Sequence, residues 1–87
     1  MVIYVLTFID EYGINSTFTF KKKTTATKIL RKKYKEAKKE AINEAKMDDE
    51  DTRYYVYAKC NNDTMSVSTS KRIILNGNIT KTTLIET

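Results

Sequence analysis

The chain has 87 residues, enough for one domain with a single modest hydrophobic core. Charged residues make up 31% of it and hydrophobic residues 40%, a balance that favours a folded globular chain over a disordered one. The formal net charge of +5 indicates an anionic partner. The composition therefore predicts one basic domain that spans residues 1–87.

The absence of histidine and the single cysteine limit the kinds of catalytic and metal site that the chain can form. The sequence has no histidine, which removes the commonest general base, the Ser-His and Cys-His nucleophile systems and most zinc sites. Cys60 is the single cysteine, so no intrachain disulfide can form, and a reducing cytoplasm is the expected location. It lies on the apolar face of a predicted strand, where we expect a buried, inert thiol. Neither glycine lies in a phosphate-cradling loop. We therefore expect a protein without catalytic activity or a cofactor.

The first predicted element covers residues 2–9. Both of its alternating faces are apolar and rich in β-branched and aromatic residues, which is typical of a strand in the interior of a sheet. The segment is too short to span a bilayer and has no basic leader, so we expect neither a signal peptide nor membrane insertion.

A hairpin is predicted next. Asp10 to Gly13 has turn composition, with Gly13 suited to a left-handed backbone position. Residues 14–22 then alternate, with Phe18 and Phe20 on one face and threonines on the other, as in a strand with one solvated face. We expect Phe18 to belong to the core.

The central prediction is one long helix within residues 21–47, which contain no glycine or proline and are dominated by Ala, Lys and Glu. Thr24 or Thr25 is expected to cap its start. At 100° per residue one apolar stripe forms, which we expect to pack on a sheet. The stripe consists of Ala26, Leu30, Tyr34, Ala37, Ala41 and Ala45. Three glutamates line one flank of it: Glu36, Glu40 and Glu44.

The opposite flank and the back of this helix are basic. Residues 21–46 hold eleven of the sixteen basic residues and three glutamates, a local net charge of +8. Lysines on a helix can serve only solvation and i,i+4 pairing, but then Lys and Glu would interleave. Because the two signs are segregated, we predict a partner-binding surface. It consists of Lys28, Arg31, Lys32, Lys35, Lys38, Lys39, Ile42 and Lys46.

Ile42 is the one apolar residue of this predicted surface, and it suits the centre of a contact. The alternative is a helix-edge residue that the C-terminal hairpin covers.

After the helix come four consecutive acids, residues 48–51, which the negative end of the helix macrodipole disfavours, so the helix should end near Met47. These acids could contribute to a Mg²⁺ site, but their spacing does not aim them at one point. We expect a solvated acidic connection and no metal site.

Residues 53–60 are predicted to form a third strand, and one of its faces is a second candidate surface. That face carries Arg53, Tyr55, Tyr57 and Lys59. Aromatic and cationic side chains that alternate along a strand resemble the stacking platforms that hold single-stranded nucleic acid. The alternative is that this face lies under the helix.

The remaining elements are strands. Residues 61–63 are expected to turn the chain into a fourth strand that begins near Met65 and continues through Ile73 to Leu75. Asn76-Gly77 is a strong hairpin signal, so residues 78–85 should fold back as the last strand. The predicted fold is α+β in β-β-α-β-β-β order: an antiparallel sheet of four or five strands, with the helix on one face and the other face partly open.

Two functions agree with these features. The first is a small inhibitor or adaptor whose basic helix occupies an anionic surface on a larger protein or nucleoprotein complex that processes nucleic acid. The second is a protein that binds nucleic acid directly and without sequence specificity, because lysine contacts to phosphates carry little base information. In size, single-domain build and lack of catalytic groups, the chain is similar to the small proteins that bacteriophages and other mobile elements encode to block host enzymes, anti-CRISPR inhibitors among them. That likeness favours the first function.

Overall fold

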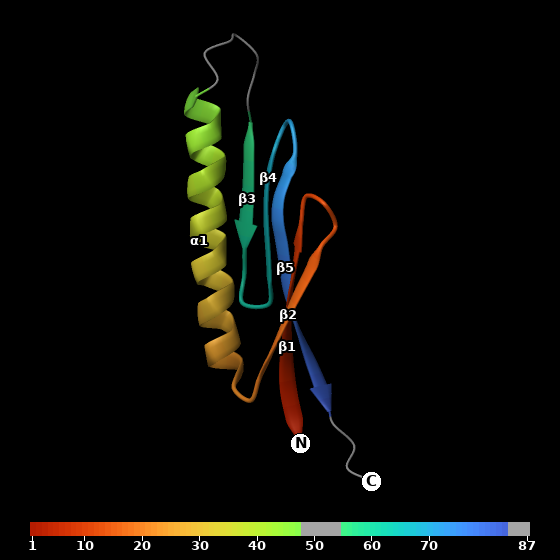
Figure 1. The fold of residues 1–87 in the computed structure, drawn as a ribbon. Coiled ribbons are helices and arrows are strands. Elements are labelled where there is room, and N and C mark those ends of the chain that lie inside the picture. Colours follow the sequence, from red (N-terminus) through yellow and green to blue (C-terminus); the bar gives the residue numbers. More distant parts are fainter. Residues whose placement is uncertain (48–54, 84–87) are drawn as a thin grey trace.

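The computed structural model describes residues 1–47 and 55–83 of the chain. These residues form a five-stranded antiparallel sheet with one helix packed on one face, so the predicted α+β fold and its element order are confirmed (Figure 1). The strand order in the sheet is β2-β1-β5-β4-β3. In chain order the elements are β1 (Val2–Asp10), β2 (Asn15–Phe20), α1 (Lys23–Met47), β3 (Val56–Cys60), β4 (Thr64–Thr69) and β5 (Ile73–Thr83).

Strand β1 lies in the interior of the sheet, as its apolar faces predicted. It pairs with β2 on one side and with β5 on the other, and its Leu6 and Phe8 are buried under the helix. The β1–β2 turn also forms as expected: the Oδ1 atom of Asp10 accepts hydrogen bonds from the backbone N–H groups of Tyr12 and Ile14. Gly13 adopts a φ of 77°, which a residue without a Cβ adopts at little cost.

The helix runs along β3, β4 and β5 and covers one side of the sheet (Figure 1). Its predicted stripe is the buried side, because Ala26, Leu30, Ala37 and Ala41 are buried and Tyr34 packs against the core. The predicted cap is wrong. The helix begins at Lys23, so both threonines lie inside its first turn.

The chain enters the helix directly from β2. Only residues 21–22 separate the two elements, and the backbone N–H of Ala26 donates to the carbonyl of Lys22. The Nζ atom of Lys23 lies 2.7 Å from Asp63 Oδ1, which ties the first residue of the helix to the β3–β4 turn. Because the helix starts before Thr24 and Thr25, neither threonine stands at its N-cap position.

The last two predicted strands were placed wrongly. Strand β4 ends at Thr69, the chain turns there, and β5 runs unbroken from Ile73 through Asn76 and Gly77 to Thr83. The turn is built by Thr69, whose Oγ1 atom accepts hydrogen bonds from two backbone N–H groups of the residues after it. A short Ser-Lys-Arg link with a threonine before it can thus turn the chain without Gly, Asn or Pro.

Gly77 has a packing role instead of a turn role. It is paired with Phe8 on β1 and with Met65 on β4, and its φ is not positive. A Cβ atom built at Gly77 would lie 2.8 Å from Cδ1 of Phe8 and 3.1 Å from Cγ of Met65. The glycine therefore makes room for the buried Phe8 ring in the middle of the sheet.

Phe18 does not belong to the buried core, contrary to the sequence prediction. It lies on the edge strand β2 with 46% of its surface exposed. Its ring meets the Phe8 ring edge to face at a centroid distance of 6.3 Å. The alternation of β2 gave the correct face of the strand, but it could not show that the helix leaves this end of the sheet uncovered.

We expect Gly77→Ala to destabilise the domain by about 1 to 3 kcal/mol, although alanine is the better strand residue, because the new methyl group overpacks the Phe8 ring. Urea denaturation gives the free energy of unfolding. Gly13→Asn is the control, since asparagine tolerates a positive φ and nothing lies within 4 Å of a Cβ there. A stabilised Gly77→Ala variant would contradict this packing role.

Leu30→Ala should cost about 2 to 5 kcal/mol, because Leu30 is fully buried at the centre of the helix stripe. Phe18→Ala should cost less, about 1 kcal/mol, since the ring is half exposed and loses mainly its contact with Phe8. Thermal melts of the two variants compare these losses. Equal losses would show that Phe18 is a core residue after all.

Candidate functional site

The predicted basic surface lies on the side of α1 that faces away from the sheet. All seven of its cationic side chains belong to exposed residues, and Ile42 has 36% of its surface exposed. The C-terminal hairpin that could have covered Ile42 does not form, since β5 is one strand. The structure thus brings all eight predicted residues together along one helix.

Most of these cations form no ion pair with an acidic residue that the structure describes. Arg31 donates from Nη2 to Oδ1 of Asn62 at 2.6 Å, and Lys38 Nζ lies 5.9 Å from the centroid of the Tyr34 ring. Neither contact neutralises a charge. The lysines at positions 28, 32, 35, 39 and 46 form no ion pair with any residue that the structure describes.

Two of the three helix glutamates, Glu40 and Glu44, are engaged on the other flank by Arg72, which follows β4. The Nη1 atom of Arg72 lies 2.9 Å from Oε1 of Glu11, and Nη2 lies 3.2 Å from Oε1 of Glu40. Glu44 accepts from both Nε and Nη2 of the same guanidinium. Glu36 is 3.7 Å from Lys33 on this flank. The negative side chains are therefore held away from the basic surface.

This cluster, Arg72 with Glu11, Glu40 and Glu44, joins three separate parts of the chain. Glu11 belongs to the β1–β2 turn, the other two glutamates to α1, and Arg72 to the β4–β5 turn. Hydrogen bonding to Glu44 is the largest cause that raises the pKa of Arg72 above its ordinary value. Burial opposes it as the second largest effect, and hydrogen bonds to Glu11 and Glu40 add to the rise. Arg72 was not among the predicted site residues, because it lies within a segment whose composition predicted a continuous strand.

The second candidate surface lies on the open face of the sheet, opposite α1, so the alternative that it lies under the helix is wrong. Tyr55 and Tyr57 are 49% and 58% exposed, and their ring centroids are 6.4 Å apart. Lys59 is exposed beyond them on β3. Arg53, the fourth predicted member, lies outside the described residues.

Neighbouring strands surround these aromatics with small polar side chains. Tyr57 pairs with Ser68 and Lys59 with Ser66, and the Ser66 hydroxyl lies 2.7 Å from Oδ1 of Asn76. The open face therefore presents two aromatic rings at one edge of a hydroxyl-rich and amide-rich surface. It offers stacking and hydrogen bonding but only one lysine from β3.

The part of the chain that the structure describes holds no candidate metal centre. Cys60 is half-buried on the helix side of the sheet, with its Sγ atom 3.5 Å from the carbonyl of Asn61. Residues 1–47 and 55–83 hold no group of three His, Cys, Asp or Glu side chains that could ligate a metal ion. The acidic run 48–51 lies outside those residues. Within residues 1–47 and 55–83, no helix is long and apolar enough to cross a membrane.

Comparison with models of known protein families, with curated proteins and with solved structures found no match.

Replacing Arg72 should destabilise the domain. Arg72→Gln leaves three carboxylates close together without a cation, so we expect a loss of about 1 to 2 kcal/mol, moderated by the partial exposure of the cluster. Arg72→Lys should recover only part of this loss, because an ammonium group cannot bridge three carboxylates as a guanidinium does. Denaturant titrations measure both losses.

The matched control is Lys33→Gln, which removes one exposed ion pair and should change stability by about 0.5 kcal/mol or less. If Arg72→Gln were no more destabilising than this control, the cluster would be an incidental surface contact.

Proposed function

We propose that this protein is a non-catalytic binding protein that uses the basic helix surface to occupy an anionic surface on a larger protein or nucleoprotein complex, as an inhibitor or adaptor of a nucleic-acid-processing machine does. The observation that carries the proposal is the separation of charge on α1. Its outward lysines form no ion pair with the described residues, while Arg72 and Lys33 engage the glutamates. A cation without an internal partner remains available to an external anion.

The dimensions of the surface suit a macromolecular partner. Lys28 and Lys46 are 18 positions apart on a continuous helix, which corresponds to about 27 Å along its axis. Ile42 adds an exposed apolar contact among the lysines. A row of cations with an apolar residue among them can be complementary to a protein surface that carries carboxylates around a shallow apolar site. The single cysteine suits action in a reducing cytoplasm.

Direct binding of single-stranded nucleic acid is a second candidate function. It is favoured by the exposed Tyr55 and Tyr57 rings, because aromatic side chains on an open sheet face can stack with bases. Those rings lie on the side of the sheet opposite the basic helix, so one strand of nucleic acid could not follow both surfaces by a short path. This separation favours the protein-binding proposal.

The test is a charge reversal of three helix lysines, Lys32→Glu, Lys35→Glu and Lys39→Glu. All three side chains are exposed and unpaired among the described residues, so the fold should persist. Lys38 is left in place because it lies over Tyr34. Capture of binding proteins from a bacterial lysate, followed by titration of the retained partner, should show affinity weakened at least about a hundredfold, several kcal/mol being expected for juxtaposed like charges.

The matched control reverses Lys21, Lys22 and Lys81, which carry the same total charge but lie outside the basic surface. It should retain the affinity of the parent. Reversal of the helix glutamates would be a poor control, because two of them hold Arg72. Equal binding of the parent and the helix triple variant at low salt would exclude the basic surface as the contact.

Salt dependence separates the two candidate functions. Contacts to phosphates on duplex release counterions, so the logarithm of the affinity should fall linearly with the logarithm of salt concentration, by nearly one unit per phosphate neutralised. A protein partner held partly by apolar contact at Ile42 should give a shallower slope.

A further inference from the structure

Strand β2 forms one edge of the sheet and has none of the usual protection against pairing with another strand. Its sequence, Asn-Ser-Thr-Phe-Thr-Phe, holds no charged residue and no proline. Its register with β1 runs without a shift from Ile9–Asn15 to Tyr4–Phe20, so it has no bulge there. Edge strands are commonly blunted by lysine, proline or a bulge, because exposed backbone groups otherwise template pairing.

The backbone groups that β2 leaves open follow from its register. The N–H of Asp10 donates to the carbonyl of Ile14, so this pair is hydrogen-bonded. In an antiparallel ladder such pairs alternate, and the next ones toward the helix are Phe8–Ser16 and Leu6–Phe18. The intervening residues Asn15, Thr17 and Thr19 therefore direct their N–H and C=O groups to the outside of the sheet.

We propose that β2 is a self-association edge, on which β2 of a second copy of this chain pairs antiparallel with Thr17 opposite Thr17 of that copy. This register satisfies the open groups of Asn15, Thr17 and Thr19 in both strands. The two sheets become one ten-stranded sheet around a twofold axis that passes between the threonines. Cross-strand threonine pairs are favourable on a sheet surface.

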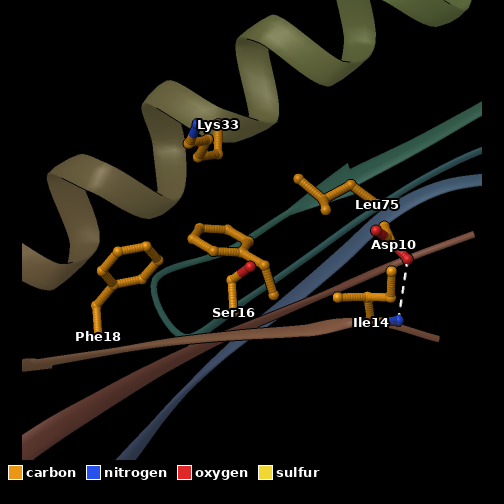
Figure 2. A pocket seen from close by; sticks show the side chains of 7 residues that line it. Asp10, Ile14, Ser16, Phe18, Lys33 and Leu75 are labelled. Atoms are coloured by element: carbon orange, nitrogen blue, oxygen red, sulfur yellow. Dashed lines mark hydrogen bonds between the residues drawn. The ribbon is translucent and has the colours of Figure 1, made fainter. Parts of the chain in front are cut away.

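The side chains on the helix side fit the same register. The half-exposed Phe18 lies opposite Ser16 of the second copy in this register. Within each copy, Phe18 and Ser16 border a cavity of about 200 Å³ between α1 and the β1–β2 hairpin (Figure 2). The cavity is lined by Phe8, Asp10, Ile14, Ser16, Phe18, Lys33 and Leu75. Because serine is small, the Phe18 ring of one copy can lie over it beside the cavity of the other and lose its contact with water.

Charge favours a second copy over another occupant. The β2 edge is uncharged, so it offers nothing to select the anionic partner for which the basic helix is suited. Arg31 of that basic surface reaches Asn62 in the β3–β4 turn, at the far side of the sheet from β2. Two copies joined at β2 thus keep their basic surfaces apart. A twofold axis perpendicular to a continuous sheet places both helices on the same face, so the assembly would present two basic surfaces in one direction.

The test uses Thr17, whose side chain is exposed on the open face and whose N–H is not needed within one copy. Sedimentation equilibrium of the full chain should show an average mass that rises with concentration from 10.1 kDa toward twice that value. Thr17→Lys and Thr17→Glu each place like charges opposite one another, so each should associate about fivefold to tenfold more weakly. An equimolar mixture of the two should associate at least as strongly as the parent.

Thr17→Pro should abolish association, because proline removes the central donor from both strands and blocks the approach of an incoming strand. Tyr57→Lys, on the opposite edge strand β3, is the control and should associate like the parent. Circular dichroism at low concentration establishes whether each variant is folded. If Thr17→Pro does not fold, the Thr17→Lys and Thr17→Glu variants and their mixture still test the proposal. A parent that stays at 10.1 kDa at millimolar concentration, or a Lys/Glu mixture no stronger than its components, would overturn the proposal.

Discussion

The arrangement of this molecule depends on the guanidinium of Arg72 and the three carboxylates around it. A single planar cation donates hydrogen bonds to Glu40 and Glu44, on two successive turns of the helix, and pairs with Glu11 in the β1–β2 turn. Its donors form a rigid fork, so the three acids are held in a defined geometry that a flexible lysine would not impose. Together with the buried stripe of Ala26, Leu30, Ala37 and Ala41, the cluster fixes how the helix is rotated about its axis relative to the sheet.

That rotation has an electrostatic consequence. Because Glu40 and Glu44 are turned toward Arg72, the lysines one third of a turn further round the helix point to solvent, away from both acids. The sorting of charge was visible in the sequence, but its cause was not. Segregated glutamates could have been exposed and available to neighbouring lysines, and only the position of Arg72 shows that they are occupied. The strongest functional observation thus depends on a residue that the sequence analysis passed over.

Local sequence patterns predicted which helix and strands form, but they did not predict where the last two strands begin and end or which residues are buried at the sheet edge. The period of Leu30 and the alanines predicted the buried stripe, because one side of the helix packs on the sheet. The apolar residues on both faces of 2–9 predicted an interior strand. Asn76-Gly77 gave a wrong hairpin prediction. The dipeptide is typical of tight hairpins, but here Gly77 leaves space for the Phe8 ring within a continuous strand. The deciding contact, Phe8 against Gly77, joins residues 69 positions apart in the sequence. Phe18 was misplaced for a similar reason, since burial at a sheet edge depends on how far the helix reaches.

The basic helix surface also carries an energetic cost that bears on its role. Lys28, Lys32, Lys35 and Lys39 follow one another at spacings of four, three and four residues, so each is a neighbour of the next on the helix. Like charges at these spacings destabilise a helix by a few tenths of a kcal/mol per pair, about 1 kcal/mol for the row. Solubility alone does not require this arrangement, because lysines that alternate with glutamates would solvate the helix and stabilise it as well. Burial of Leu30 and the Arg72 cluster offset the cost and keep the helix folded. A repulsive row of cations gains free energy when an anionic surface approaches, so the same residues that weaken the isolated helix are the ones that favour a complex.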